Sequence, residues 1–90
     1  MASSDPHYRL YLKRSVLKDL EAIPRAYRER ILDRIKSLAA NPRPRGAEKL
    51  TARGDFRVRV GPYRILYRVS DRDATVVVFK VAHRKDAYRR

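Results

Sequence analysis

The sequence contains no cysteine, so neither a disulfide nor a thiolate metal site can hold this chain together. This absence fits a reducing cytoplasm, where we expect the protein to work. No apolar run approaches the length that spans a bilayer, and the start of the chain lacks the apolar core of a signal peptide. The sequence therefore predicts a soluble protein with no membrane partner.

Histidine is also scarce, because His7 and His83 are the only two in the chain. The sequence has no internal repeat, no Gly-rich phosphate loop, no cluster of metal-ligand residues and no Ser-His-Asp arrangement. These absences argue against a zinc enzyme and against a hydrolase built on a histidine-paired nucleophile. We predict that the protein uses neither a metal nor a cofactor.

Positive charge is what the sequence has in excess: 23 Lys+Arg face 10 Asp+Glu, for a net charge of +13. The imbalance is larger in the second part of the chain, because residues 41–90 hold fourteen basic and five acidic residues whereas residues 1–40 hold nine and five. Seventeen of the basic residues are arginine, whose planar guanidinium binds phosphate through paired hydrogen bonds and stacks on bases. Such a surface attracts polyanions, and nucleic acid is the partner that this composition favours.

The strongest local pattern runs from residue 56 to residue 69, where apolar and basic residues alternate on both sides of Gly61-Pro62. It predicts an antiparallel hairpin with a two-residue loop. The expected facing pairs are Val60 with Tyr63, Arg59 with Arg64, Val58 with Ile65, and Arg57 with Leu66. Three arginines would then share one face, where like charges cost stability unless an anion binds them. The alternation alone leaves open whether this face binds an anion or is an ordinary solvated surface.

The apolar periodicities predict one small α+β domain over residues 1–90, with the order β-α-α-β-β-β and a flexible tail at residues 1–7. The expected elements are a strand at 8–12, helices at about 16–23 and 24–38, and strands at 56–60, 63–69 and 75–82. We expect an antiparallel meander with 75–82 in the middle of the sheet, because that segment is apolar on both faces. The helical hairpin should cover one face. Mixed charges on the second helix, such as Arg30, Asp33 and Arg34, favour a solvated outer face over a nucleic-acid-binding helix.

Three segments resemble a known family in their order, spacing and residues. They are Glu48-Lys49-Leu50, the segment Arg57-x-Arg59-x3-Tyr63-Arg64-Ile65-Leu66-Tyr67, and Val81-Ala82-His83-Arg84-Lys85-Asp86-Ala87-Tyr88-Arg89. Together they resemble the RelE toxins of the RelE/ParE superfamily, over about residues 8–89. The resemblance implies the toxin of a type II toxin-antitoxin system, an endoribonuclease that cuts mRNA in the ribosomal A site. The implied partners are mRNA, the ribosome and an acidic, RelB-like antitoxin, with a monomeric free toxin that forms a hetero-oligomer with the antitoxin.

The resemblance also implies which residues act. The catalytic residues that it implies are Arg57, Arg59, Arg64, Arg84 and Tyr88, and we add His83 to this set as a candidate for proton transfer. The RNA-binding set comprises Arg53, Arg68, Lys85 and Arg89. The implied reaction is attack of a ribose 2'-hydroxyl on the adjacent phosphate, which leaves a 2',3'-cyclic phosphate and a free 5'-hydroxyl. Arginines arranged around that phosphate would stabilise the charge of the transition state.

The general base is open at this point. Relatives carry lysines where this chain has Arg57 and Arg59, and arginine stays protonated, so it is a poor proton acceptor. Tyr88 comes first among the candidates, because neighbouring guanidiniums would raise its acidity. His83 comes second, since its ordinary pKa suits proton transfer, and Glu48 third, because some relatives use a glutamate there.

Two other functions compete with the nuclease. The first is that of the ParE branch, which shares the fold and inhibits DNA gyrase without cutting nucleic acid. The second is a non-catalytic module that binds RNA or the ribosome through its charge alone, since phosphate binding needs no catalytic geometry.

Overall fold

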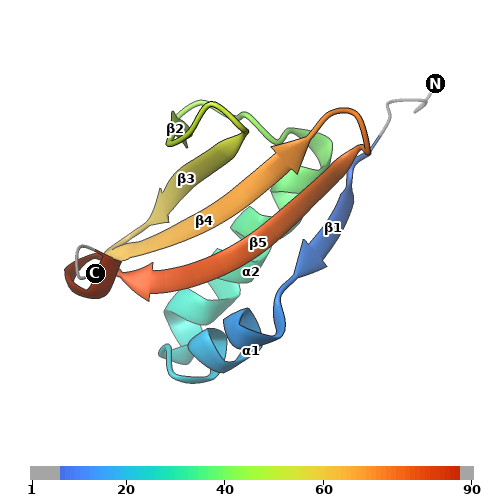
Figure 1. Cartoon of the computed structure of the whole chain (residues 1–90). Helices are drawn as coiled ribbons and strands as arrows, with labels where there is room; N and C mark the ends of the chain where they lie inside the picture. Colours follow the sequence, from blue (N-terminus) through green and yellow to red (C-terminus); the bar gives the residue numbers. More distant parts are fainter. Residues whose placement is uncertain (1–6, 88–90) are drawn as a thin grey trace.

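The chain folds into a five-stranded sheet with two helices against one of its faces (Figure 1). The computed structural model describes residues 7–87. Its elements are β1 (Arg9–Leu12), α1 (Arg14–Glu21), α2 (Arg25–Ala40), β2 (Glu48–Lys49), β3 (Asp55–Val60), β4 (Tyr63–Ser70), β5 (Thr75–His83) and α3 (Arg84–Ala87). The predicted α+β class and the helical hairpin on one face are confirmed. The predicted tail at residues 1–7 lies, apart from His7, outside the described residues.

Helix α2 owes its place to an apolar stripe. Tyr27, Ile31, Ile35 and Leu38 recur every three or four residues, which puts them on one face of a helix. The last three are buried with exposures of at most 1%, and they pack in the core beneath the sheet. Pro24 directly precedes the helix, where its missing N–H removes no helical hydrogen bond. No helix within residues 7–87 combines the length and the hydrophobicity needed to cross a membrane.

The strands lie in the order β1-β5-β4-β3-β2. All four expected facing pairs of the hairpin occur between β3 and β4, so the predicted register is confirmed. Strand β5 lies between β1 and β4, which confirms the central position predicted from its apolar sequence. The hairpin is therefore held on one side by a buried strand.

The sheet departs from the prediction in three places. Strand β1 pairs with β5 in parallel, so the sheet is mixed rather than antiparallel throughout. The sequence pattern also does not predict β2, of 2 residues, or α3, of 4 residues. Elements this short carry no periodicity, and a parallel pairing between distant segments leaves no local pattern.

The core lies between the sheet and the two long helices. From the sheet, Val58, Ile65, Tyr67 and Val76 are each fully buried. The Tyr67 hydroxyl donates to the carbonyl oxygen of Pro42 at 2.8 Å, and burial raises the pKa of Tyr67 to about 12. This bond fixes the loop after α2 to the core. Neither α1 nor α2 covers the other face of the sheet, which carries the basic positions of the hairpin (Figure 1).

Candidate active site at one end of the sheet

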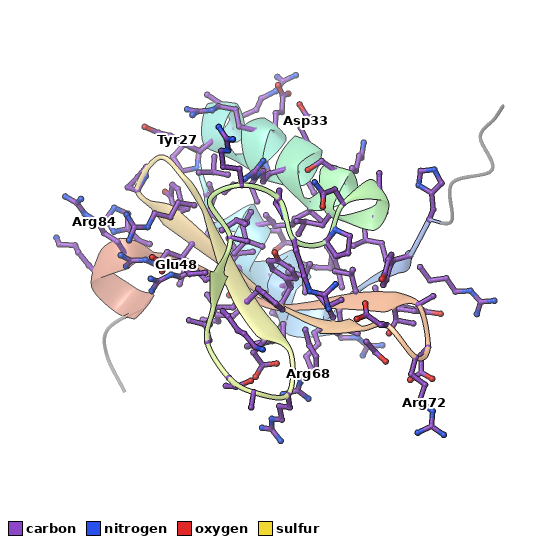
Figure 2. The ribbon with its side chains drawn as sticks, turned by 90° about the horizontal axis from the view of Figure 1, so that it is seen from above. Tyr27, Asp33, Glu48, Arg68, Arg72 and Arg84 are labelled. Carbon is purple, nitrogen blue, oxygen red and sulfur yellow. The ribbon has the colours of Figure 1, made fainter. Side chains whose placement is uncertain are left out.

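The hairpin turn at Gly61-Pro62 lies beside the end of β5 and the start of α3, and we call this region the turn end of the sheet (Figure 1). Two hydrogen bonds join its segments. The Arg84 amide donates to the Pro62 carbonyl at 2.7 Å, and Nη1 of Arg64 donates to the Arg84 carbonyl at 3.3 Å. The first residue of α3 is thereby fixed to the hairpin. Figure 2 shows Arg84 at this end of the molecule and Arg72 at the opposite end.

The three arginines of the hairpin share a face but differ in their surroundings. Arg59 is exposed and forms no ion pair with any residue in the range 7–87. Arg64 is buried, with 5% of its surface exposed. Arg57 is half-buried, and its Nη2 donates to Oε1 of Glu48 on the neighbouring strand β2. The expected cluster of three like charges is thus reduced, because Glu48 neutralises one of them.

His83 is oriented by contacts on two sides. The backbone amide of Lys85 donates to its Nδ1 at 3.2 Å, and its ring meets Tyr63 edge-on with centroids 5.4 Å apart. Because Nδ1 accepts a hydrogen bond, the neutral ring carries its proton on Nε2. His83 is therefore set to donate a hydrogen bond from Nε2 rather than to accept a proton there.

At the other end of the sheet, which we call the far end, two arginines are paired with carboxylates. Arg68 donates to both carboxylate oxygens of buried Asp55, at 2.6 and 3.2 Å. The hydrogen bond from Arg68 holds the pKa of Asp55 below its usual range, and Asp55 in turn raises the pKa of Arg68. Exposed Arg53 lines a hollow of about 360 Å³ together with this pair and Phe79.

A second pairing at the far end ties three segments together. The Tyr8 hydroxyl donates to Asp71 at 2.6 Å, and Arg43 donates to both oxygens of the same carboxylate at 3.1 and 3.0 Å. Tyr8 and Arg43, in that order, lower the pKa of Asp71. The Arg43 guanidinium also lies 5.4 Å from the centroid of the Phe56 ring. These contacts join the start of β1, the crossover loop and the β4–β5 turn.

The structure thus brings some of the predicted site residues together and separates others. Arg59, Arg64, His83, Arg84 and Lys85 lie at the turn end, with Arg57 one step back along β3. Arg53 and Arg68 lie at the far end. Tyr88 and Arg89 lie outside the described residues. Arg34 of α2 lines a hollow with Arg57 and Arg59, and the sequence did not predict it as a site residue. The mixed charges around it favoured a solvated helix face instead.

The comparisons with known proteins place this small mixed sheet, with arginines at the end of its hairpin, among the toxins of type II toxin-antitoxin systems. The family model of the ParE toxin of type II toxin-antitoxin system, parDE, matches residues 10–88. The chain belongs to this family, and the resemblance to RelE toxins is confirmed by the following relatives.

The toxin RelG of Mycobacterium tuberculosis is 54% identical over 37 residues, which are 41% of this chain and 42% of that protein. The match to RelG thus spans less than half of its length. The putative toxin RelE1 of Methanocaldococcus jannaschii is 28% identical over 91% of this chain and 96% of its own. Among solved structures, the RelBE2 toxin-antitoxin complex of M. tuberculosis contains a chain with a TM-score of 0.74 and 29% identity, covering 86% of this chain and 98% of that one.

Proposed function

We propose that the protein is a ribosome-dependent endoribonuclease that cleaves mRNA in the ribosomal A site, and that the turn end is its active site. The observation that carries the proposal is that Arg59, Arg64 and Arg84 lie around the hairpin turn, where Arg59 faces Arg64 and two hydrogen bonds join the Arg64 side chain to the Arg84 backbone and the Arg84 backbone to Pro62. These are residues that the resemblance to RelE toxins assigns to catalysis. Membership in a toxin family and the net charge of +13 support the same conclusion.

In the proposed reaction, the 2'-oxygen of the ribose forms a bond to the adjacent phosphorus while the bond from phosphorus to the 5'-oxygen breaks. The 2'-hydroxyl gives its proton to a base, and the leaving 5'-oxygen takes up a proton. Negative charge grows on the phosphoryl oxygens during the reaction. Fixed guanidiniums stabilise that charge best, because they need no reorganisation as it develops.

Exposed Arg59 and Arg84 are accessible to a phosphate, whereas buried Arg64 has a structural contact as well. We assign direct phosphate binding to Arg59 and Arg84, and we assign to Arg64 the additional task of holding the start of α3. Arg57 keeps a partner in Glu48, so its role is weaker charge stabilisation.

The contacts in the structure bear on the general base. The carboxylate of Glu48 is engaged by Arg57, and Nδ1 of His83 by the Lys85 amide. Both contacts compete with proton acceptance. We therefore keep Tyr88 as the proposed base, with His83 as a hydrogen-bond donor to the phosphate or to the leaving oxygen.

Primer extension on an mRNA in a purified translation reaction tests the proposal. The wild type should produce cuts at A-site codons, and a double variant with Arg59→Ala and Arg84→Ala should not. A parallel lane with RNA and no ribosomes shows whether cleavage depends on the ribosome. Cleavage by the double variant at the wild-type rate would remove these arginines from the mechanism.

The family model that matches is named for ParE, and this favours gyrase inhibition as the second candidate function. Supercoiling assays with purified DNA gyrase separate the two. If the wild type inhibits gyrase and leaves mRNA intact, the nuclease proposal fails and the second candidate replaces it. RNA binding without either activity would favour the non-catalytic module.

We also propose that the partner is an antitoxin, since the related structure is a toxin-antitoxin complex, and that this antitoxin is acidic. A basic toxin attracts an acidic segment electrostatically, and such a segment could inhibit by covering the turn end or displacing the Tyr88 region. A complex in which the antitoxin leaves the turn end accessible to RNA would contradict this mode of inhibition.

A further inference from the structure

A groove follows the edge of β3, between α2 and the loop that leads to β2, and we call it the α2 groove. It consists of two adjoining hollows. The smaller, of about 290 Å³, is lined by Arg34, Gly46, Glu48, Arg57 and Arg59. The larger, of about 480 Å³, is lined by Arg30, Asp33, Arg34, Ser37, Arg59, Val60 and Gly61. Because Arg34 and Arg59 line both hollows, the two adjoin, and together they extend from α2 to the turn end.

Positive charge dominates the α2 groove. Four guanidiniums line it against two carboxylates, and one of these, Glu48, is already bound to Arg57. Within residues 7–87, none of Arg30, Arg34 and Arg59 forms an ion pair. Like charges held this close repel one another, so a bound anion would be stabilised here.

Unused hydrogen-bond donors lie in the same place. The Nε atoms of Arg34 and Arg57 are buried and have no hydrogen-bond partner among residues 7–87. Arg34 makes one long bond, from Nη2 to the Arg45 carbonyl at 3.4 Å. A buried donor without an acceptor is unfavourable, and phosphate oxygens are acceptors that match the guanidinium fork. The smaller hollow therefore has both the charge and the donors of a phosphate site.

The glycine of the hairpin turn helps to form the groove. Gly61 has a φ of +56°, and a Cβ atom there would lie 2.6 Å from Cε1 of Tyr27. The turn therefore packs directly against the Tyr27 ring, and the Arg30 guanidinium stacks over that ring at 5.3 Å. This contact holds the hairpin turn against α2, and Arg30 of α2 and Arg59 of β3 both line the larger hollow.

We propose that the α2 groove binds the phosphate backbone of single-stranded RNA next to the cleaved linkage, with Arg34 and Arg30 as the main contacts. Identifying the ligand as RNA rests on the proposed nuclease function. The strand would continue from the turn end through Arg59, which lines the groove and also belongs to the proposed active site. The arginines of α2, which the sequence pattern favours as solvated residues, thus become a binding surface.

The test is a binding measurement that does not depend on cleavage. Fluorescence anisotropy with a labelled single-stranded RNA of about 12 nucleotides, long enough to occupy the groove and the turn end, is recorded over a range of salt concentrations. The groove variant carries Arg30→Gln and Arg34→Gln. The matched control carries Arg9→Gln and Arg72→Gln, which removes the same charge at two exposed positions outside the groove.

We expect the groove variant to bind at least about tenfold more weakly and its salt slope to fall by about 1.4, since each lost phosphate contact on a single strand contributes about 0.7. The affinity of the control variant for the RNA should fall less than about threefold, which is the effect expected from the lower net charge alone. The Arg34→Lys variant keeps the charge but loses the forked guanidinium, so its RNA affinity should lie between those of the wild type and the groove variant. Thermal unfolding of each variant identifies any that fails to fold, and Arg34→Lys then replaces it.

Equal losses in the groove variant and the control would overturn the proposal, as would a wild type that does not bind the RNA. A groove variant that binds RNA like the control but loses binding to a poly-glutamate peptide would assign the groove to an acidic protein instead. The proposed nuclease can fail separately. Groove-dependent RNA binding without mRNA cleavage would support the groove as a binding site and overturn the proposed nuclease. Cleavage without groove-dependent binding would support the nuclease and overturn the groove as a binding site.

Discussion

The two ends of the sheet use arginine in opposite ways. At the far end, Arg68 and Arg43 each donate twice to one carboxylate, Asp55 and Asp71, and hold segments together. At the turn end, Arg59 is exposed and has no ion pair within residues 7–87. The residue type is the same, and the difference is whether the fold supplies a carboxylate. Where it does, the cation contributes to structure, and where it does not, its charge is available to a ligand.

This comparison predicts that replacing the exposed arginines of the turn end lowers function and keeps stability, whereas breaking the pair of Arg68 with buried Asp55 lowers stability and keeps function. Activity and stability therefore have to be measured on the same proteins. The predictions below run from the largest expected effect to the smallest.

Replacing Arg59 and Arg84 by alanine should lower ribosome-dependent cleavage by about 10²–10³-fold, because the loss of a donor to a developing negative charge costs that much. Their removal should change the free energy of unfolding by no more than about 0.5 kcal/mol, since both side chains are exposed. Primer extension and urea denaturation measure the two quantities. A variant that loses stability in proportion to activity would break the contrast between the ends.

Gly54→Ala should destabilise the protein by about 2 kcal/mol through backbone strain. Gly54 has a φ of +100°, and a Cβ atom there would lie 2.6 Å from the Val69 carbonyl oxygen, which is backbone and cannot swing away. Gly46→Ala is the control, because its φ is also positive, at +94°, but its nearest neighbour would be 4.0 Å away. Urea denaturation should show a clearly larger loss at Gly54, and equal losses would mean that the close approach to Val69 does not matter.

Asp55→Asn should cost about 1 kcal/mol at neutral pH, the upper range for an ion pair whose arginine is 45% exposed. Because Arg68 lowers the pKa of Asp55 in the folded state, the pair stabilises fully above the unfolded pKa of about 3.9, and this stabilisation is lost as the pH falls through the folded value. The difference between wild type and variant should thus be constant from about pH 7 to about pH 5 and shrink below about pH 4. A difference that grows in acid would contradict the assignment.

Arg43→Gln should leave the midpoint of thermal unfolding unchanged within error, since Arg43 and Asp71 are 44% and 61% exposed. The pKa of Asp71 should rise only part of the way to its ordinary value, because the Tyr8 hydroxyl still donates to it. NMR titration of the Asp71 carboxyl measures this shift. Tyr8→Phe should also raise the pKa of Asp71, because it removes the other donor to that carboxylate.

The hairpin shows what sequence can predict here. Its register follows from the alternation of apolar and basic residues on both sides of a two-residue break, and all four predicted facing pairs occur. The same alternation says nothing of why Arg64 is buried and Arg59 exposed, because it carries no information on the segments that lie beside the hairpin, such as the start of α3, whose Arg84 carbonyl accepts a hydrogen bond from Arg64.

Long-range features escaped prediction for a physical reason. The parallel pairing of Arg9 with Thr75 and the approach of Arg34 to Arg59 join segments that are far apart in the chain. No local periodicity encodes such contacts. The pairing of β4 with β5 shifts register between Leu66 and Tyr67 of β4. This shift also leaves no signal in the sequence, because the paired strand β5 is almost uniformly apolar.

The central position of β5 has a consequence for how the protein is made. Strand β5 is the last strand in chain order, yet β1, the first, pairs only with it. Strand β1 can therefore pair only after β5 has been synthesised. Contacts between segments so far apart in the chain form slowly, because the entropy of closing the long loop between them must be lost first. A nascent chain that stops before residue 75 has no strand for β1 to join and no end of β5 to carry Arg84 to the hairpin. Incomplete translation products that stop before residue 75 would accordingly lack both the partner of β1 and the complete turn end.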